Sequence, residues 1–145
     1  MNEPKAVQNT PASADDVAFF QEIEGLQGKR PMLVLPEGLT AEDVVALSMI
    51  ATERARQITE ERFTSDHDDG HPVSDLELAG GEYLLHAGSS DIHRSAFPPR
   101  RPSAEWPMDD ESWNPKSRIR DGVRGCALGV AGIAARLRRG EPVEG

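Results

Sequence analysis

The chain has 145 residues and a formal net charge of −9, with 37% hydrophobic and 5% aromatic residues. This length supports one domain with a single modest core, and the low apolar content indicates that part of the chain stays outside it. The overall negative charge would repel a phosphate backbone, which argues against general nucleic-acid binding. The charge is uneven, however: residues 1–93 carry −12, whereas residues 94–145 carry +3 and can meet an anionic small molecule.

The chain is expected to work in a reducing cytoplasm. Its single cysteine, Cys126, excludes an internal disulfide. The start of the chain is polar and acidic, unlike a secretory signal, and the longest apolar run, 125–135, is far shorter than the roughly 20 residues that cross a membrane. We therefore expect no membrane association.

Residues 1–14 are expected to form a disordered arm, 15–140 a helical domain and 141–145 a tail. A short helix is predicted over 15–26. The apolar run after it contains residues 32–35, which are compatible with a short edge strand and also with an extended segment laid across helices.

A longer helix is predicted from Thr40 to about Arg62. Thr40 and Asp43 match a capping box at its start. One face is apolar and is expected to point to the core; it carries Val44, Leu47, Ala51, Ala55 and Ile58. The opposite face is polar and carries Glu53, Arg56, Gln57 and Glu60. A polar loop follows over 64–75.

The next predicted helix covers 76–87, with Asp75 as a candidate cap, and its apolar residues are Leu78, Leu84 and Leu85. Gly80 and Gly81 each weaken it by about 1 kcal/mol relative to alanine. A long loop rich in proline, serine and arginine is predicted over 88–117, where Trp106 and Trp113 are expected to bury their rings and hold the loop in place.

The last predicted helix begins after Ser117 and ends before Gly140. Its large apolar residues form a seam: Ile119, Val123, Cys126, Val130, Ile133 and Leu137. The Cys126 thiol is accordingly expected to be buried and inert. A second stripe consists of glycines: Gly122, Gly125, Gly129 and Gly132. Four glycines cost roughly 3–4 kcal/mol of helix propensity, so we expect a partner packed close against this backbone. Two-fold contact with a second copy of the chain is one such partner, which makes a homo-oligomer a hypothesis.

Together these elements predict a mainly α-helical domain of three or four helices, with at most one short strand and a long loop containing proline and tryptophan. The helices over 40–62 and 117–139 are expected to form the core pair.

One candidate site is a metal site. The loop His67-Asp68-Asp69-Gly70-His71 places two imidazoles around two carboxylates, and Glu53 and Glu60 precede it. Such a set can bind a divalent cation, either magnesium or manganese. The structural alternative, which we favour, is that these acids cap turns and pair with arginines.

The second candidate is a ligand site. Arginines of the 40–62 and 117–139 helices converge if the two helices pack together, and guanidinium groups bind phosphates bidentately while tryptophans stack on bases. The residues concerned are Arg54, Arg56, Gln57, Trp106, Trp113, Arg120 and Arg124. The alternative, again the favoured one, is that these arginines neutralise the acidic half of the chain.

Two groups of residues form an ordered pattern. The first group contains Glu53-Arg54, Arg56-Gln57, Glu61, Phe63, His67-Asp68-Asp69, His71, Glu77-Leu78-Ala79 and Tyr83. The second contains Trp106-Pro107, Trp113-Asn114-Pro115-Lys116, Arg120-Asp121, Val123, Ala127-Leu128, Ala131, Ile133 and Leu137. This pattern, which spans about half of the chain, resembles a family of small proteins encoded by phages and prophages. The run from the arginines to the histidines is also similar to part of the ryanodine-receptor repeat, a small helical module suspected of binding nucleotide-like ligands.

The resemblance implies an accessory protein of phage origin in the cytoplasm of a bacterial host, and it implies no particular reaction. The leading hypothesis is a non-enzymatic binding protein active in phage–host conflict. It would sequester a nucleotide-like molecule or occlude a host protein. The alternative is a metal-dependent nucleotide phosphohydrolase that uses the carboxylates of residues 53–77.

Overall fold

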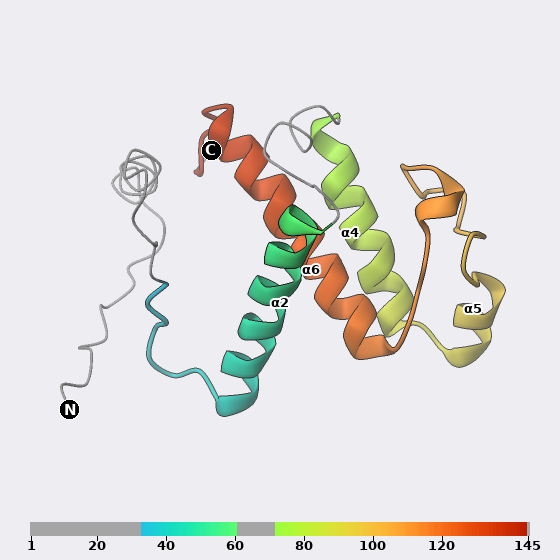
Figure 1. The fold of residues 1–145 in the computed structure, drawn as a ribbon, viewed down its shortest axis with the longest axis horizontal. Helices are drawn as coiled ribbons and strands as arrows, with labels where there is room; N and C mark the ends of the chain where they lie inside the picture. Colours follow the sequence, from blue (N-terminus) through green and yellow to red (C-terminus); the bar gives the residue numbers. More distant parts are fainter. Residues whose placement is uncertain (1–32, 61–71, 145) are drawn as a thin grey trace.

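Helices account for the ordered core of the chain, as shown by the computed structural model, which describes residues 33–60 and 72–144 (Figure 1). The elements are α2 (Ala41–Thr59), α4 (Val73–Gly88), α5 (Asp91–Ala96), the 3₁₀ turn η1 (Asp110–Ser112) and α6 (Arg118–Arg138). Neither of the two described ranges contains a strand, and residues 33–36 have no regular structure. The prediction of a mainly α-helical domain is therefore confirmed. The helix predicted over 15–26 and the arm over 1–14 lie outside the described residues.

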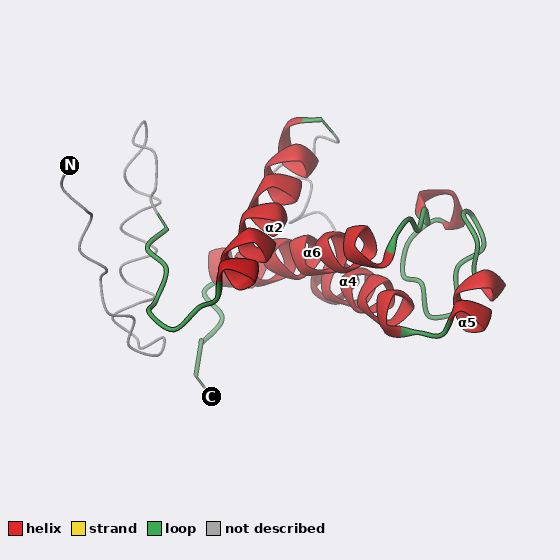
Figure 2. Ribbon diagram, turned by 90° about the horizontal axis from the view of Figure 1, so that it is seen from below, coloured by secondary structure: helices red, strands yellow, loops and turns green. Residues whose placement is uncertain are grey.

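The central pair consists of α4 and α6, which run antiparallel and side by side (Figures 1 and 2). They touch where Gly80 faces Gly125: a Cβ atom built on either glycine would lie 2.7 Å from the carbonyl oxygen of the other. Two turns further along α6, a Cβ on Gly132 would lie 2.5 Å from Cδ of Glu77. The close partner expected for the glycine stripe is thus α4 at Gly125 and Gly132. The predicted core pair was wrong, because α4 replaces the 40–62 helix as the main partner of α6.

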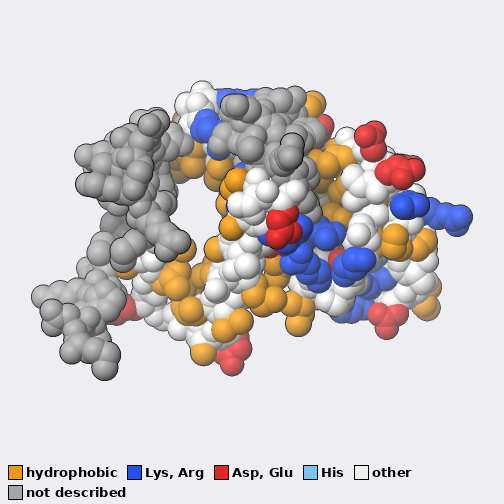
Figure 3. Space-filling view, viewed as in Figure 1, with side chains coloured by type: hydrophobic (Ala, Val, Ile, Leu, Met, Phe, Trp, Pro, Cys, Tyr) orange, Lys and Arg blue, Asp and Glu red, His pale blue; other side chains and the backbone are white. Residues whose placement is uncertain are grey.

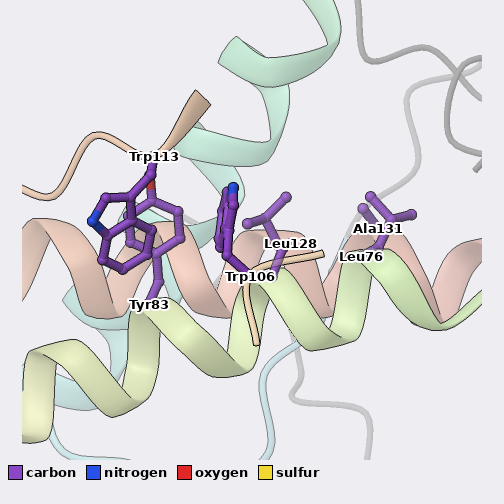
Figure 4. Packing of buried hydrophobic residues seen from close by; sticks show 7 residues of the cluster. Leu76, Tyr83, Trp106, Trp113, Leu128 and Ala131 are labelled. Carbon is purple, nitrogen blue, oxygen red and sulfur yellow. The ribbon is translucent and has the colours of Figure 1, made fainter. Parts of the chain in front are cut away.

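An aromatic cluster fills the space between these two helices and the loop that joins them (Figure 4). Tyr83 of α4 stacks on Trp113 with 4.7 Å between ring centroids, and Trp106 meets both rings edge-on. The indole N–H of Trp113 donates to the Phe97 carbonyl at 3.0 Å, which satisfies its one polar atom. Both tryptophans are buried, so the prediction that they hold the loop in place is confirmed.

The buried face of α6 differs from the predicted apolar seam. Ile119 is 69% exposed, Ile133 57% and Val130 43%, whereas Val123 is buried and Cys126 is only partly buried. The buried positions are mostly small: Gly125, Ala127, Leu128, Ala131, Gly132 and Ala135. The prediction that this seam forms the buried face was wrong, because backbone-to-backbone packing favours small side chains, whereas large ones would hold the helices apart.

The face that α2 turns to α6 is also the opposite of the one expected. Its buried residues are Glu53 and Gln57, while Val44, Leu47 and Ile58 are 39–41% exposed. Apolar side chains are visible along the outer side of this helix in Figure 3. The polar face points inward because α6 supplies arginines that pair with Glu53, a partner that hydrophobic periodicity does not reveal.

Two details of the middle region also correct the prediction. Asp75 is not the N-cap of α4, which begins one turn earlier with Pro72 in the cap position, and Leu78, Leu84 and Leu85 are 45–59% exposed. The predicted 88–117 loop contains α5, whose N-cap Ser90 accepts a hydrogen bond from the backbone N–H of His93.

Three of the helix ends predicted from capping chemistry are confirmed. Thr40 and Asp43 form a reciprocal capping box, in which hydrogen bonds from the backbone and hydroxyl of Thr40 hold the pKa of the Asp43 carboxyl below its ordinary value. Ser117 caps α6. Gly140 ends it with φ +73°, and the next residue's N–H reaches back to the Arg136 carbonyl, as in a Schellman motif.

Candidate ligand-binding site

A buried glutamate surrounded by arginines lies where α2 meets α6. The Glu53 side chain is 1% exposed, and Arg56, one turn along α2, binds it with two hydrogen bonds of 2.9 Å. Arg120 of α6 brings Nη2 to 2.6 Å from Oε2, and Arg124 brings Nε to 4.0 Å from Oε1. Three guanidinium groups from two helices therefore converge on one carboxylate.

These arginines decide the charge state of Glu53. Burial by itself raises the pKa of the carboxyl, but hydrogen bonds and charge from Arg56 and Arg120 outweigh burial and hold the pKa below its ordinary value. Glu53 thus stays ionised and cancels one of three positive charges. Glu60, which lies 3.6 Å from Arg56, is 68% exposed and is screened by solvent. Figure 3 shows the resulting group of basic side chains between the end of α2 and the beginning of α6.

The guanidinium group of Arg120 has unused donors. Its side chain is 37% exposed, and Nη2 meets Glu53. No other hydrogen bond or ion pair of this guanidinium exists within residues 33–60 and 72–144. The remaining N–H groups of Arg120 can therefore donate to an anion that approaches from solvent.

A cavity of about 150 Å³ adjoins this charge cluster. Helices α2, α4 and α6 and the tryptophan loop all contribute to its lining: Gln57, Tyr83, Trp106, Met108, Ser112, Asn114, Arg124 and Leu128. Arg124 connects the two features. Its Nη1 donates to the Tyr83 hydroxyl at 3.0 Å and to the Asn114 carbonyl at 2.8 Å, and its guanidinium carbon lies 5.1 Å from the centroid of the Tyr83 ring.

Two polar groups in the cavity wall have unused hydrogen-bonding capacity. Gln57 is 1% exposed, and its carbonyl oxygen Oε1 is buried without a hydrogen-bond partner. The Tyr83 oxygen accepts hydrogen bonds from Arg124 and from the backbone N–H of Asn114, so its own O–H proton is not used in either contact. A buried polar atom left unpaired costs about 1–3 kcal/mol.

The structure gathers most of the predicted ligand-site residues in this region. Arg56, Gln57, Trp106, Arg120 and Arg124 all belong to the cavity or to the arginine cluster.

Two predicted members lie elsewhere. Trp113 packs behind Tyr83 and lines a separate cavity of about 120 Å³, and Arg54 is half-buried and does not line the 150 Å³ cavity. The sequence interpretation also omitted Tyr83 from the site. Its signal is that it is the single tyrosine of a chain poor in aromatic residues, one turn beyond Gly80.

The predicted metal site is only partly covered by the structure. His67, Asp68, Asp69 and His71 lie outside the described residues, so their role stays a prediction. Both carboxylate oxygens of Glu53 are occupied by arginines, which would repel a cation, and Glu60 is directed to Arg56. Within the described ranges, no three His, Cys, Asp or Glu side chains are placed to hold a metal ion.

A second buried polar network joins the end of α4 to the start of α6. Asp121 is 0% exposed and accepts from the Lys116 N–H at 2.6 Å and from Nη2 of Arg94 at 3.2 Å. Nδ1 of His86 lies 3.1 Å from the same carboxylate. Arg94 also donates to the carbonyls of His86 and Lys116, and Arg118 donates to the carbonyls of Ala87 and Ser89 at the end of α4. Because these contacts link helix ends to one another, we assign the network a structural role.

Comparison of the chain with models of protein families, with curated proteins and with solved structures gave no match. The resemblance to phage-encoded proteins therefore stays a prediction. In the part of the chain that the structure describes, no helix combines the length and the apolar character needed to cross a membrane.

Proposed function

We propose that this protein binds a small anionic ligand with an aromatic part, of nucleotide-like chemistry, in the cavity between α2, α4, α6 and the tryptophan loop. The observation that carries the proposal is the position of the arginine cluster beside that cavity. The two features share Arg124, so one ligand can reach both.

The anionic part of the ligand is argued from charge. Within the described residues, three guanidinium groups meet one buried carboxylate, Glu53, and one exposed carboxylate, Glu60, which leaves an excess of positive charge in a chain whose overall charge is −9. Guanidinium donors match the geometry of phosphate and carboxylate oxygens. Arg120 offers such donors to solvent, and its contact with Glu53 holds the side chain in position for the ligand.

The aromatic part of the ligand is argued from the lining. Tyr83 and Trp106 supply ring surfaces, and Met108 and Leu128 supply apolar contacts. Stacking of a base on an aromatic side chain is worth about 1–3 kcal/mol. Apolar walls with a few polar groups are typical of small-molecule sites.

Among the carboxylates that the structure describes, the geometry favours binding over catalysis. A phosphohydrolase needs carboxylates free to hold magnesium, but Glu53 is engaged by arginines and Glu77 pairs with Arg136 at 2.6 Å. The role that fits a non-catalytic site is sequestration. In the setting implied by the phage resemblance, the ligand would be a nucleotide-like signal of the bacterial host.

The first test is a binding screen with the full chain. Nucleoside monophosphates are titrated by calorimetry, and we expect binding that Arg120→Gln weakens by about tenfold or more, since a hydrogen bond to a charged group contributes about 1.5–3 kcal/mol. Arg101→Gln is the matched control, because it removes the same charge from an exposed loop position. Equal affinity in both variants would refute the site.

The second test separates binding from turnover. The protein is incubated with nucleoside mono- and triphosphates and with magnesium or manganese, and the products are separated by chromatography. We expect the nucleotides to be recovered unchanged. Hydrolysis that Glu53→Gln abolishes would instead favour the phosphohydrolase.

A further inference from the structure

We propose that the outer face of α2 binds the same face of a second copy of this chain, with the two helices antiparallel about a two-fold axis. The surface is the apolar stripe of α2, which consists of Val44, Leu47, Ala51, Ala55 and Ile58. This stripe lies on the other side of the helix from the buried Glu53 and Gln57. The proposal therefore goes beyond the ligand site and does not depend on it.

The packing of α2 is the reverse of that expected for an amphipathic helix. Its polar residues Glu53 and Gln57 are buried, whereas the large members of the apolar stripe are 39–41% exposed. Every residue from 41 to 49 is exposed as well. Most helical stability in proteins comes from packing an apolar face, and a helix of this length is marginal without it. The apolar stripe, visible in Figure 3, is therefore a face without a partner in the part of the chain that the structure describes.

The spacing of the apolar stripe is typical of a seam between two helices. Successive steps of three, four and seven residues separate Val44, Leu47, Ala51 and Ile58, which are a and d positions of consecutive heptads. The d position before Ile58 is Arg54. In such a seam each side chain inserts between residues of a facing helix. The partner is therefore expected to be a helix with a similar seam, and α2 of a second copy meets this requirement.

The order of large and small residues makes the apolar stripe complementary to itself. Val44 and Leu47 lie in the first half, whereas Ala51 and Ala55 lie in the second. An antiparallel pair with its axis near residue 49 places Leu47 of each copy opposite Ala51 of the other. It places Val44 opposite Ala55 in the same way. Each large side chain then meets a small one, whereas a parallel pair would set large residues against each other and leave gaps at the alanines.

Contacts near the ends of the apolar stripe favour the same orientation. One flank carries Asp43 in the first turn of α2 and Arg54 towards its end. The antiparallel pair places Asp43 of each copy beside Arg54 of the other, whereas a parallel pair would bring like charges together. The same register brings Ile58 to Leu39, which is 37% exposed just before the helix of the other copy. Charge and apolar surface are therefore both complementary under one two-fold axis.

The first experiment measures the mass of the full chain by light scattering over a dilution series. Leu47→Glu puts a charge in the middle of the apolar stripe. It should raise the dissociation constant of the dimer at least about tenfold, because the carboxylate would be buried without a partner. Leu78→Glu is the matched control, because it makes the same change at a position of α4 that is 52% exposed. The control should dimerise as the wild type does, and the two variants should melt at the same temperature when they are monomeric.

The second experiment tests the orientation in a chain whose native thiol is removed by Cys126→Ala. Ser48→Cys should form a disulfide between two copies on oxidation, because residue 48 lies beside the proposed axis. Ala41→Cys should not, since two residues at that position would lie about 24 Å apart along antiparallel helices at 1.5 Å per residue. Cross-linking of Ala41→Cys but not of Ser48→Cys would show a parallel pair and overturn the proposed arrangement.

Two other results would refute the proposal. A monomer at every concentration would exclude the second copy, and a melting temperature of Leu47→Glu well below that of Leu78→Glu would then show that another segment of the same chain covers the apolar stripe. A dimer that Leu47→Glu leaves unchanged would form through another surface, such as the exposed Ile119 and Ile133 of α6. None of these results depends on Arg120, so the proposed ligand site is tested separately.

Discussion

Replacing Gly125 with alanine probes the contact between the backbones of α4 and α6. In an isolated helix, alanine is favoured over glycine by about 0.8–1 kcal/mol. In this protein the added Cβ would lie 2.7 Å from the Gly80 carbonyl oxygen, 2.8 Å from Cγ of Leu84 and 3.2 Å from the backbone nitrogen of Leu84. Two of these three atoms belong to the backbone of α4, so the clash is relieved only if the helices move apart.

The expected magnitude is the difference between two opposing effects. Extra atoms forced into a packed interface cost about 1–3 kcal/mol, and a backbone clash belongs at the upper end of that range. After the gain in helix propensity is subtracted, Gly125→Ala should destabilise the protein by roughly 2 kcal/mol. Gly129→Ala, one turn along the same helix, has no atom within 4 Å of its new Cβ. It should therefore stabilise by about 0.5–1 kcal/mol.

The assay is urea unfolding followed by circular dichroism at the helical band, with thermal melts as a second measure. The two variants should differ by about 3 kcal/mol, or roughly 6–12 °C in melting temperature at 2–4 °C per kcal/mol. Gly122→Ala provides a second control, because its Cβ also meets nothing within 4 Å. If Gly125→Ala stabilises as much as the controls, α4 and α6 do not touch at this point and the description of the core is incorrect.

Three further predictions concern other contacts. Glu53→Gln should destabilise the protein by about 3 kcal/mol at neutral pH. Because folding lowers the pKa of Glu53, the difference in unfolding free energy between wild type and variant should reach its full size above the ordinary carboxyl pKa. It should disappear as the pH falls through the lowered pKa of the folded protein, and urea titrations that give a pH-independent difference would contradict this prediction. Trp113→Ala should cost about 3–5 kcal/mol in urea unfolding, since its ring is 2% exposed and stacked on Tyr83; a loss below 1 kcal/mol would show that the loop is not held by this ring. Gly132→Ala should gain its full helix propensity only when combined with Glu77→Ala, which a double-mutant cycle measures.

Local chemistry made three helix ends predictable, whereas the predicted cap Asp75 of α4 was wrong. The Thr40 hydroxyl and the Asp43 carboxylate satisfy each other within a single turn, and Ser117 and Gly140 act on their immediate neighbours. Such signals depend on residues at most a few positions apart, so the rest of the fold does not alter them.

The partner of each helix face was much harder to predict. Hydrophobic periodicity gives weight to large side chains, but α4 and α6 approach each other at Gly80 and Gly125, which have none. The two faces of α2 were correctly separated as polar and apolar, yet the choice of the inward one depends on Arg120 and Arg124, which lie 67 and 71 residues beyond Glu53 in sequence. Pairing of that kind is fixed by the tertiary fold.

The charged residues of the candidate site could be predicted from the sequence. The arginines of the last helix were expected near α2 if the helices packed, and Arg120 and Arg124 do meet Glu53. The cavity itself was not predictable, because its volume depends on how Tyr83 and Trp106 pack against α6. No spacing rule in the sequence encodes the size of that gap.

The arginine contacts that join the end of α4 to the start of α6 determine what a break in the chain between these helices would do. Arg118 holds the carbonyls of Ala87 and Ser89 at the end of α4, and Arg94 of α5 holds Lys116 before the start of α6, so the two ends of the connection are tied together by contacts that do not involve residues 100–101. Residues 100–101, near the middle of that chain, are two exposed arginines. A protease that cuts there would remove little of what joins the halves, and the nicked protein should still migrate as one particle. The same position is therefore suited to receive an inserted tag or a new pair of chain ends.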